Sequence, residues 1–304
     1  MAKKIHPYVK KSLKILAFLL FFALPAQAAQ MPEQEPITWQ HPFDLGEEDI
    51  SPAVVEAEAL PPPPLPAPVR HTQKPVIAIV IDDMGLDRRR CPRAVKNLPA
   101  PVTLSYLPYA PHVQQQADAA KAAGHEIMLH MPMEADNPAT DPGPHHLSTG
   151  MSRFEVLQNA TVSLDSFQGY DGVNNHMGSR FTADRAGLEV FMEVLEKRHA
   201  YFLDSKTSPD SIAERVAHEH GIPSTRRDVF IDHVETPAFV ASALHHIEAI
   251  ARATGSAVAI GHPKDVTLAS LEAWVPTLEA KGFRVVPLSE VVKYRNTAER
   301  TAGK

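Results

Sequence analysis

The chain has 304 residues, is 44% hydrophobic and carries a formal net charge of −6, so it can bury the core of one or two domains. Its acidic balance, without a stripe of Lys and Arg interleaved with aromatic residues, argues against nucleic acid as a partner, because phosphate backbones bind basic surfaces. The single cysteine, Cys91, excludes an intramolecular disulfide, so the fold depends on its core or on a bound metal.

The first 28 residues have the pattern of a secretory signal peptide. Five lysines precede the uncharged run 15–24, which is shorter than the roughly 20 residues that span a bilayer. Residues 25–28 then supply a small-residue cleavage pattern. We expect cleavage after Ala28 and a periplasmic location, and loss of the five lysines changes the formal net charge from −6 to −11. Without cleavage, the uncharged stretch 15–32 would serve as a membrane tether.

Residues 29–73 have the composition of a disordered linker. Eight acidic residues and one arginine lie between positions 29 and 70, and the run 61–68 is PPPPLPAP. Such a segment cannot form a packed core, and its proline end favours an extended polyproline II spacer. Two interpretations stay open: a passive tether, and a docking motif for a protein partner.

Residues 74–293 alternate short apolar runs with segments of helical periodicity, which predicts repeated βα units. The expected strands are 76–81, 102–107, 126–131, 172–176, 201–204, 229–232, 257–260 and 284–287. The expected helices are 111–123, 153–167, 183–198, 209–220, 237–254 and 267–281, and a polar tail, 294–304, follows the domain.

These units predict an α/β fold, a distorted (β/α) barrel of seven or eight units. The run 76–81 is apolar throughout, which indicates a strand buried on both faces in a parallel sheet. The number of units stays open, because the segment 221–233 can supply one strand or an irregular excursion.

Polar side chains follow nearly every expected strand. In a βα barrel the carboxyl ends of the strands meet at one rim, where functional sites are built, so we expect these residues to gather there. They are Asp82, Asp83, Tyr106, His130, Asn174, Asn175, His176, Asp204, Ser205, Asp232, His233 and His262.

The pair Asp82-Asp83 suits a metal-dependent site. Adjacent residues at a strand end point in different directions, so one carboxylate can bind a divalent metal while the other accepts a proton. His125 and His130 lie at opposite ends of the strand expected at 126–131, and we expect only His130 at the rim. Glu134 would return an oxygen to the same place if the chain folds back at Pro132.

Together these segments resemble the divergent branch of the polysaccharide deacetylase superfamily, the NodB-like proteins. The resemblance covers about residues 75–292 and depends on the segments 81–85, 129–134, 174–180, 202–206 and 260–264. It implies a distorted (β/α) barrel with a mononuclear metal site, most typically zinc.

Carried over residue by residue, the resemblance implies that Asp82 is the catalytic base, Asp83 and His130 are metal ligands, and His262 is the catalytic acid. Glu134 stands where the mainstream family has its second metal-binding histidine. The arginine-proline-aromatic motif of that family is also absent, and the segment 174–180 stands in its region.

We therefore expect His176 to supply the missing imidazole, with Glu134 as an alternate or outer ligand, because two nitrogens and one carboxylate suit a catalytic zinc. Asp204 and Asp228 are expected to orient His262 or Arg227. The supporting positions expected around the site are Glu134, Asn175, Arg180, Asp204 and Asp228.

The resemblance implies an exported hydrolase that removes N-acetyl groups from an envelope polysaccharide such as peptidoglycan. Two alternatives stay open. The altered metal motif is also typical of a glycan-binding or scaffold protein that has lost turnover. The acidic, proline-rich linker would also suit a structural periplasmic protein that is recruited by a partner.

Overall fold

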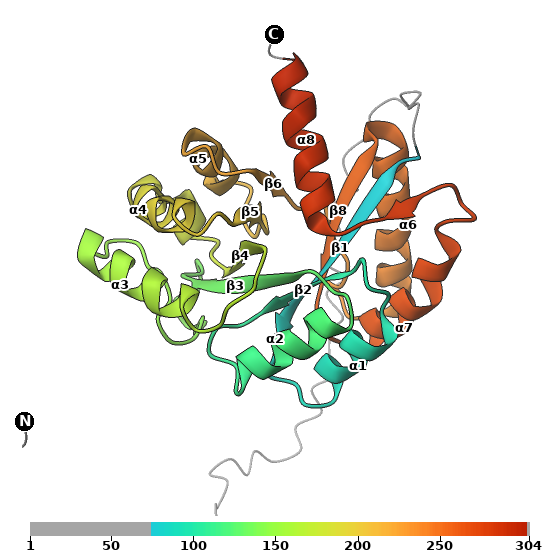
Figure 1. Cartoon of the computed structure of the whole chain (residues 1–304), viewed down its shortest axis with the longest axis horizontal. Helices are drawn as coiled ribbons and strands as arrows, with labels where there is room; N and C mark the ends of the chain where they lie inside the picture. Colours follow the sequence, from blue (N-terminus) through green and yellow to red (C-terminus); the bar gives the residue numbers. More distant parts are fainter. Residues whose placement is uncertain (1–73, 303–304) are drawn as a thin grey trace, which may run out of the picture. The chain divides into compact units, whose positions relative to one another are not determined.

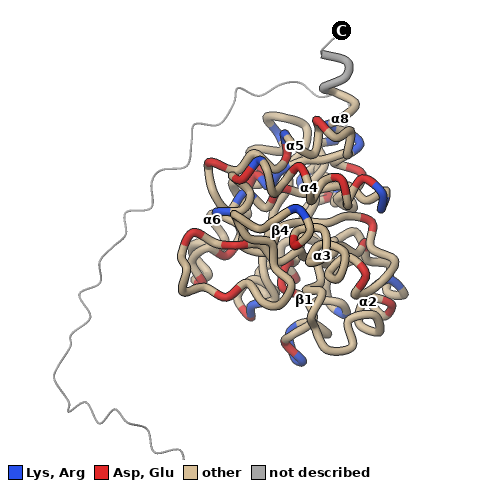
Figure 2. The backbone as a smooth tube through the Cα atoms, turned by 90° about the vertical axis from the view of Figure 1, so that its left-hand side faces the viewer, with Lys and Arg blue, Asp and Glu red and all other residues tan. Residues whose placement is uncertain are grey.

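The computed structural model describes residues 74–302. The expected signal peptide, 1–28, and linker, 29–73, lie outside the described residues. Within them, Figure 1 shows a curved sheet with helices α1 to α7 around its outer side. Acidic and basic residues are interspersed along these helices (Figure 2). No helix in the described part of the chain is long and apolar enough to cross a membrane.

The sheet has nine strands, and every pairing between them is parallel. The strand order is β6-β5-β4-β3-β2-β1-β8-β7, and β9 pairs with β1. The strands are β1 (Val76–Met84), β2 (Thr103–Tyr106), β3 (Ile127–Met133), β4 (Gly172–Met177), β5 (Tyr201–Asp204), β6 (Ser224–Arg226), β7 (Val229–Phe230), β8 (Ser256–Gly261) and β9 (Arg284–Val285).

Helices follow most strands, which makes the domain the distorted (β/α) barrel that the sequence predicts. They are α1 (Arg90–Asn97), α2 (Val113–Ala122), α3 (Arg153–Leu164), α4 (Arg185–Glu196), α5 (Ala213–Glu219), α6 (Pro237–Thr254), α7 (Asp265–Trp274) and α8 (Leu288–Ala302). Local signals set several ends: Ser152 and Glu155 form a capping box at α3, and Gly255 ends α6 with a positive φ.

Successive side chains of strand β1 point alternately into two apolar cores. Ile77 and Ile81 belong to the larger core between the sheet and the outer helices, whereas Val76 and Val80 belong to a smaller core with α8. Because side chains alternate across a strand, the residue after Ile81 returns to the inner face. That residue is Asp82, so the inner layer of the barrel begins apolar and ends polar.

Helix α8 closes the amino-terminal end of the barrel. Leu288 and Val291 belong to the inner core. The N–H of Leu288 donates to Oγ1 of Thr103 at 3.1 Å, and the N–H of Ser289 donates to Oε1 of Glu126 at 3.1 Å. These side chains satisfy helix N-terminal donors that have no partner within the helix. A layer of apolar side chains therefore lies beneath the polar residues of the rim.

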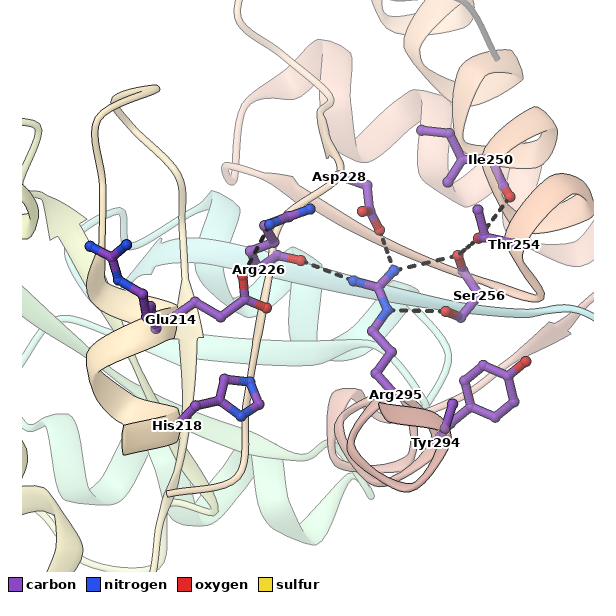
Figure 3. A pocket seen from close by; sticks show the side chains of 11 residues that line it. Glu214, His218, Arg226, Asp228, Ile250, Thr254, Ser256, Tyr294 and Arg295 are labelled. Carbon is purple, nitrogen blue, oxygen red and sulfur yellow. Dashed lines mark hydrogen bonds and ion pairs between the residues drawn. The ribbon is translucent and has the colours of Figure 1, made fainter. Parts of the chain in front are cut away.

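Helix α8 also fills the gap between the two ends of the sheet. Among the described residues no pairing joins β6 to β7. Arg295 bridges this gap: its guanidinium donates to Oγ of Ser256 at 3.0 Å and to Oδ2 of Asp228 at 2.5 Å (Figure 3). It also donates to Oγ1 of Thr225 on β6 at 3.0 Å. A cavity of about 630 Å³ lies beside this residue. We call the contact between Arg295, β6 and β8 the seam.

Three expectations about the elements need correction. The polar tail 294–304 is helical to Ala302, and Asn296 within it donates to the carbonyl of Ser224 at 2.7 Å. The segment 221–233 supplies two short strands, β6 and β7, rather than one. Helix α1 was not predicted. The sequence around it is rich in arginine, and only two residues of the helix, Cys91 and Ala94, are buried.

Candidate metal and catalytic site

The two adjacent carboxylates near the carboxyl end of β1 converge, although the sequence predicted that they diverge. The pairing of β1 with β2 shifts register between Ile81 and Met84, and Asp83 has a φ of 54°. This left-handed conformation is uncommon for a residue with a side chain. It brings Oδ1 of Asp83 to 3.3 Å from Nε2 of His130, while Oδ2 of Asp82 lies 3.6 Å from the same nitrogen.

Asp83, His130 and His176 form a group suited to a divalent metal. One ligand atom from each lies within 4.8 Å of the others, and Nδ1 of His176 is 2.9 Å from Oδ1 of Asp83. Oδ1 of Asp83 is buried and accepts no hydrogen bond in the described structure. A buried oxygen without a donor that faces two imidazole nitrogens fits a cation between them, and the donor set suits zinc.

Glu134 lies outside this group. Its Oε2 accepts from the N–H of Thr149 at 2.7 Å and from Oγ1 of Thr149 at 2.5 Å, and its Oε1 is 3.7 Å from Nη1 of Arg180. Burial raises the pKa of Glu134, but the bonds from Thr149 and the charge of Arg180 outweigh it and lower the pKa. The geometry therefore favours His176 over Glu134 as the third ligand.

The paired strands explain why the two histidines meet. His130 pairs with Asn174 between β3 and β4, and Pro132 pairs with His176 two residues further along. Their imidazole rings lie with centroids 4.9 Å apart. Burial raises the pKa of Asp83, but the two facing imidazoles outweigh it and hold that pKa well below its usual range.

His262 is held by Asp232, a partner that the sequence did not assign to it. Nδ1 of His262 lies 3.0 Å from Oδ1 of Asp232, whose Oδ2 accepts from the backbone N–H of His262 and from Oγ1 of Thr267, both at 2.7 Å. The opposite ring nitrogen, Nε2, lies 3.7 Å from Oδ2 of Asp83. Burial lowers the pKa of His262, but Asp232 and Asp83 outweigh it and raise the pKa.

Neither Asp204 nor Asp228 contacts His262 in the described structure, whereas the charges of both oppose the effect of burial on the pKa of Arg227, the other expected partner. Oδ1 of Asp204 accepts from the N–H of Lys206 at 2.8 Å and stabilises the turn after β5. Asp228 pairs with Arg295 at the seam, because it precedes β7 and therefore lies toward the opposite end of the barrel.

Asn175 and Arg180 also lie outside the metal group. Asn175 donates to the carbonyl of Met177 at 2.7 Å and accepts from the N–H of Ser205 at 2.8 Å, so it joins the ends of β4 and β5. Arg180 is exposed and faces Glu134. His125 bonds to backbone carbonyls at the other end of β3, as its predicted position implies.

Asp82 lies beneath the metal group, where it is 2% exposed. Nδ2 of Asn174 donates to both of its carboxylate oxygens, at 2.9 and 3.0 Å. Burial raises the pKa of Asp82, and this outweighs the charges of His130 and His262, which lower it. A buried carboxylate with a raised pKa suits a proton acceptor.

The group opens into a cavity of about 310 Å³ at the rim. Asp83, His176 and His262 line it together with Leu86 and Tyr109. A ligand in this cavity would touch the carboxylate and imidazole groups directly.

Comparisons with known proteins find a matching family model and similar relatives. The family model for divergent polysaccharide deacetylases matches residues 79–292. An uncharacterized protein of Haemophilus influenzae is 35% identical over 66% of this chain and 71% of its own length. Uncharacterized protein YibQ of Escherichia coli is 33% identical over 66% of this chain, and the match spans 63% of that relative.

A solved structure has the same fold. The crystal structure of an uncharacterized protein from Agrobacterium tumefaciens superposes with a TM-score of 0.70 at 30% identity, over 74% of this chain and 92% of that one. The matched region contains the whole metal and catalytic group described above. The chain belongs to the divergent polysaccharide deacetylase family.

Proposed function

We propose that the protein is an exported, metal-dependent hydrolase that removes N-acetyl groups from an envelope polysaccharide such as peptidoglycan. The observation that carries the proposal is the cluster of Asp82, Asp83, His130, His176 and His262, three of which, Asp83, His176 and His262, line one cavity. Membership of the deacetylase family supports the reaction class.

Asp83, His130 and His176 would hold the metal. A divalent cation there supplies Lewis-acid chemistry, since it polarises a carbonyl oxygen and makes water more acidic. Every other part of the reaction falls to side chains of this chain.

Asp82 acts as the base and His262 as the acid. Asp82 takes a proton from water as the water oxygen bonds to the amide carbon. His262 then gives a proton to the nitrogen as the carbon–nitrogen bond breaks, which releases acetate and leaves an amine on the sugar. Asp232 keeps Nε2 of His262 directed toward the cavity, because it binds the opposite nitrogen.

Acetate release from N-acetylated glycans tests the proposal. We expect release by the zinc-loaded protein, loss of release after chelation, and loss of at least about 100-fold for Asp82→Asn, the range of a general base. Because Asp82 is not among the ligands, Asp82→Asn should still bind zinc at one equivalent. An Asp82→Asn protein that releases acetate at the wild-type rate would contradict the role of this residue.

One observation favours a second candidate, a glycan-binding protein without turnover. Asp82 is 2% exposed and both of its oxygens accept bonds from Asn174, so a water molecule has to reach a covered base. Binding of acetylated glycan without acetate release, in the presence of zinc, would support this alternative.

The periplasmic location is a separate proposal that depends on residues 1–28. Cell fractionation should find the mature protein, lacking these residues, in the periplasm. Recovery of the full-length chain in the membrane fraction would instead support the uncleaved tether.

A further inference from the structure

Asn174 is a buried amide whose hydrogen-bonding groups all have side-chain partners. It is 0% exposed. Its Nδ2 donates to both oxygens of Asp82, at 2.9 and 3.0 Å, and to Oγ of Ser205 at 3.1 Å. Its Oδ1 accepts from Oγ of Ser105 at 2.6 Å and lies 2.9 Å from Nδ1 of His130. Asn174 therefore contacts the base on one side and a metal ligand on the other.

The chemistry of these partners fixes which way the amide faces. An ionised carboxylate only accepts hydrogen bonds, so the NH₂ group of Asn174 must face Asp82. The amide oxygen then faces His130, and Nδ1 of His130 must carry a hydrogen to donate to it. The lone pair of the neutral ring is left on Nε2, the nitrogen that faces Asp83 at 3.3 Å.

We propose that Asn174 is a positioning residue that sets the separate tasks of Asp82 and His130. Through its oxygen it selects the His130 tautomer that presents Nε2 to a metal. Through its nitrogen it binds both oxygens of Asp82 and holds this carboxylate in place as the base. The second half rests on the proposed function, whereas the first half concerns metal binding alone.

Asn175 offers a matched control on the same strand. It is also 0% exposed, but its side chain bonds only to backbone groups, the carbonyl of Met177 and the N–H of Ser205. Replacing either asparagine with leucine removes a buried amide. Only the Asn174 change removes a bond to a metal ligand.

Zinc affinity of the purified protein, measured by competition with a chromophoric chelator, tests the first half. For Asn174→Leu we expect a dissociation constant raised by about 10- to 100-fold, the usual effect of losing the group behind a metal-bound histidine. Asn175→Leu should change it by less than about tenfold. Asn174→Asp keeps an oxygen for His130 but has no amide donor for Asp82, so it should bind zinc well yet release little acetate.

Ring nitrogen NMR of the metal-free protein at alkaline pH, where the imidazoles are neutral, gives a readout that depends on neither metal nor turnover. His130 should carry its hydrogen on Nδ1 in the wild type and in Asn175→Leu. Asn174→Leu should lose this preference.

Three results separate the inference from the proposed function. A folded Asn174→Leu protein with wild-type zinc affinity and an unchanged His130 tautomer would overturn the inference. A wild-type protein that binds zinc but releases no acetate would overturn the hydrolase and leave the first half standing. Should Asn174→Leu fail to fold, zinc binding with unimpaired acetate release by Asn174→Asp would overturn the second half of the inference, because Asp82 would then not need the amide of Asn174.

Discussion

At the scale of single residues, the charge of His262 depends on Asp232. An acid must be protonated to act, so activity is lost as pH rises through its pKa. Asp232 and Asp83 raise the pKa of His262 against the effect of burial. Asp232→Asn removes one of these charges, so the alkaline limb of the pH profile should move to lower pH.

The pH dependence of kcat/KM for acetate release measures this shift. The acid limb, set by Asp82, should move less, because no contact joins Asp82 to Asp232 in the described structure. Thr267→Val removes one bond to Asp232 but keeps its charge, and it should leave the alkaline limb near its wild-type position. An unmoved limb in Asp232→Asn would exclude His262 as the acid.

Glu214, on α5, predicts a pH dependence of stability. Burial raises its pKa, so the folded state binds a proton more tightly than the unfolded state. Ionisation of Glu214 therefore lowers the free energy of unfolding. The loss is absent at pH values below the pKa of Glu214 in the unfolded state and complete above its pKa in the folded state. Glu214→Gln should gain stability over the wild type as pH rises from acid to neutral, measured by urea unfolding. A constant difference at all pH values would contradict this.

The main site residues could be predicted because each lies toward the carboxyl end of a strand and because the segments resemble a family. Asp83, His130 and His176 do meet. The partner of His262 was harder to predict, because it depends on register: Phe230 pairs with Ile260, which sets Asp232 beside His262. A sequence shows that Asp232 follows a strand, but it does not show which strand lies next to it.

At the scale of elements, the turn after β1 depends on Gly85. It has a φ of 113°, and a Cβ at this position would lie 2.4 Å from the Cβ of Ala110. Gly85→Ala adds backbone strain and a steric overlap, so we expect a loss of about 3 kcal/mol or more in the free energy of unfolding. Zinc affinity should also fall, because Asp83 lies only two residues before Gly85, at the end of β1.

Gly150 supplies the control for this prediction. Its φ is 79°, and nothing lies within 4 Å of an added Cβ. Gly150→Ala should therefore cost only about 1 kcal/mol, the penalty of the left-handed backbone, and should leave zinc affinity unchanged. Equal losses for the two variants in denaturant unfolding would show that Ala110 yields to the added methyl group.

The best-predicted elements are those with local signals at their ends. The strand expected at 201–204 is β5, and the helix expected at 237–254 is α6, whose first residue is Pro237 and whose end is marked by Gly255. Helix α8 lacked such a signal, since polar residues surround its few core contacts. The left-handed backbone at Asp83 was also not predicted, because the sequence has no glycine at that position and does not show the register shift between β1 and β2.

At the scale of the whole molecule, the barrel depends on the seam at Arg295. Arg295 and Asp228 are 20% and 19% exposed, and the arginine bonds to both sides of the gap. Arg295→Met leaves a largely buried carboxylate without its cation, so we expect a loss of about 2–4 kcal/mol in the free energy of unfolding.

Arg153→Met provides the comparison. Arg153 is 58% exposed and pairs with Glu193, which is 38% exposed, an ion pair of the kind that contributes less than about 1 kcal/mol. Both variants lose one positive charge, so this loss cancels in the comparison. We expect Arg295→Met to lower the free energy of unfolding, measured in urea, by more than the control variant does. Similar losses would mean that α8 holds the seam through its apolar contacts alone.

The barrel as a whole could be predicted from its repeated βα units, but the seam could not. Both β6 and β7 are short, and their sequence, 224–230, shows no apolar run that would separate two strands from one. An arginine from the last helix bonds to both sides of this interruption, and such a long-range contact leaves no local pattern.

The alternation along β1 makes the site sensitive to changes in chain length. Val76, Val80 and Asp82 share the inner face, whereas Ile77 and Ile81 face the helices. Deleting one residue within this strand would turn the carboxylate into the apolar layer outside and move isoleucines inward. Substitutions along β1 can be judged one at a time, but a single-codon insertion or deletion there would exchange both faces at once. We therefore expect homologues to accept length changes in the loops around the rim and to reject them in this strand.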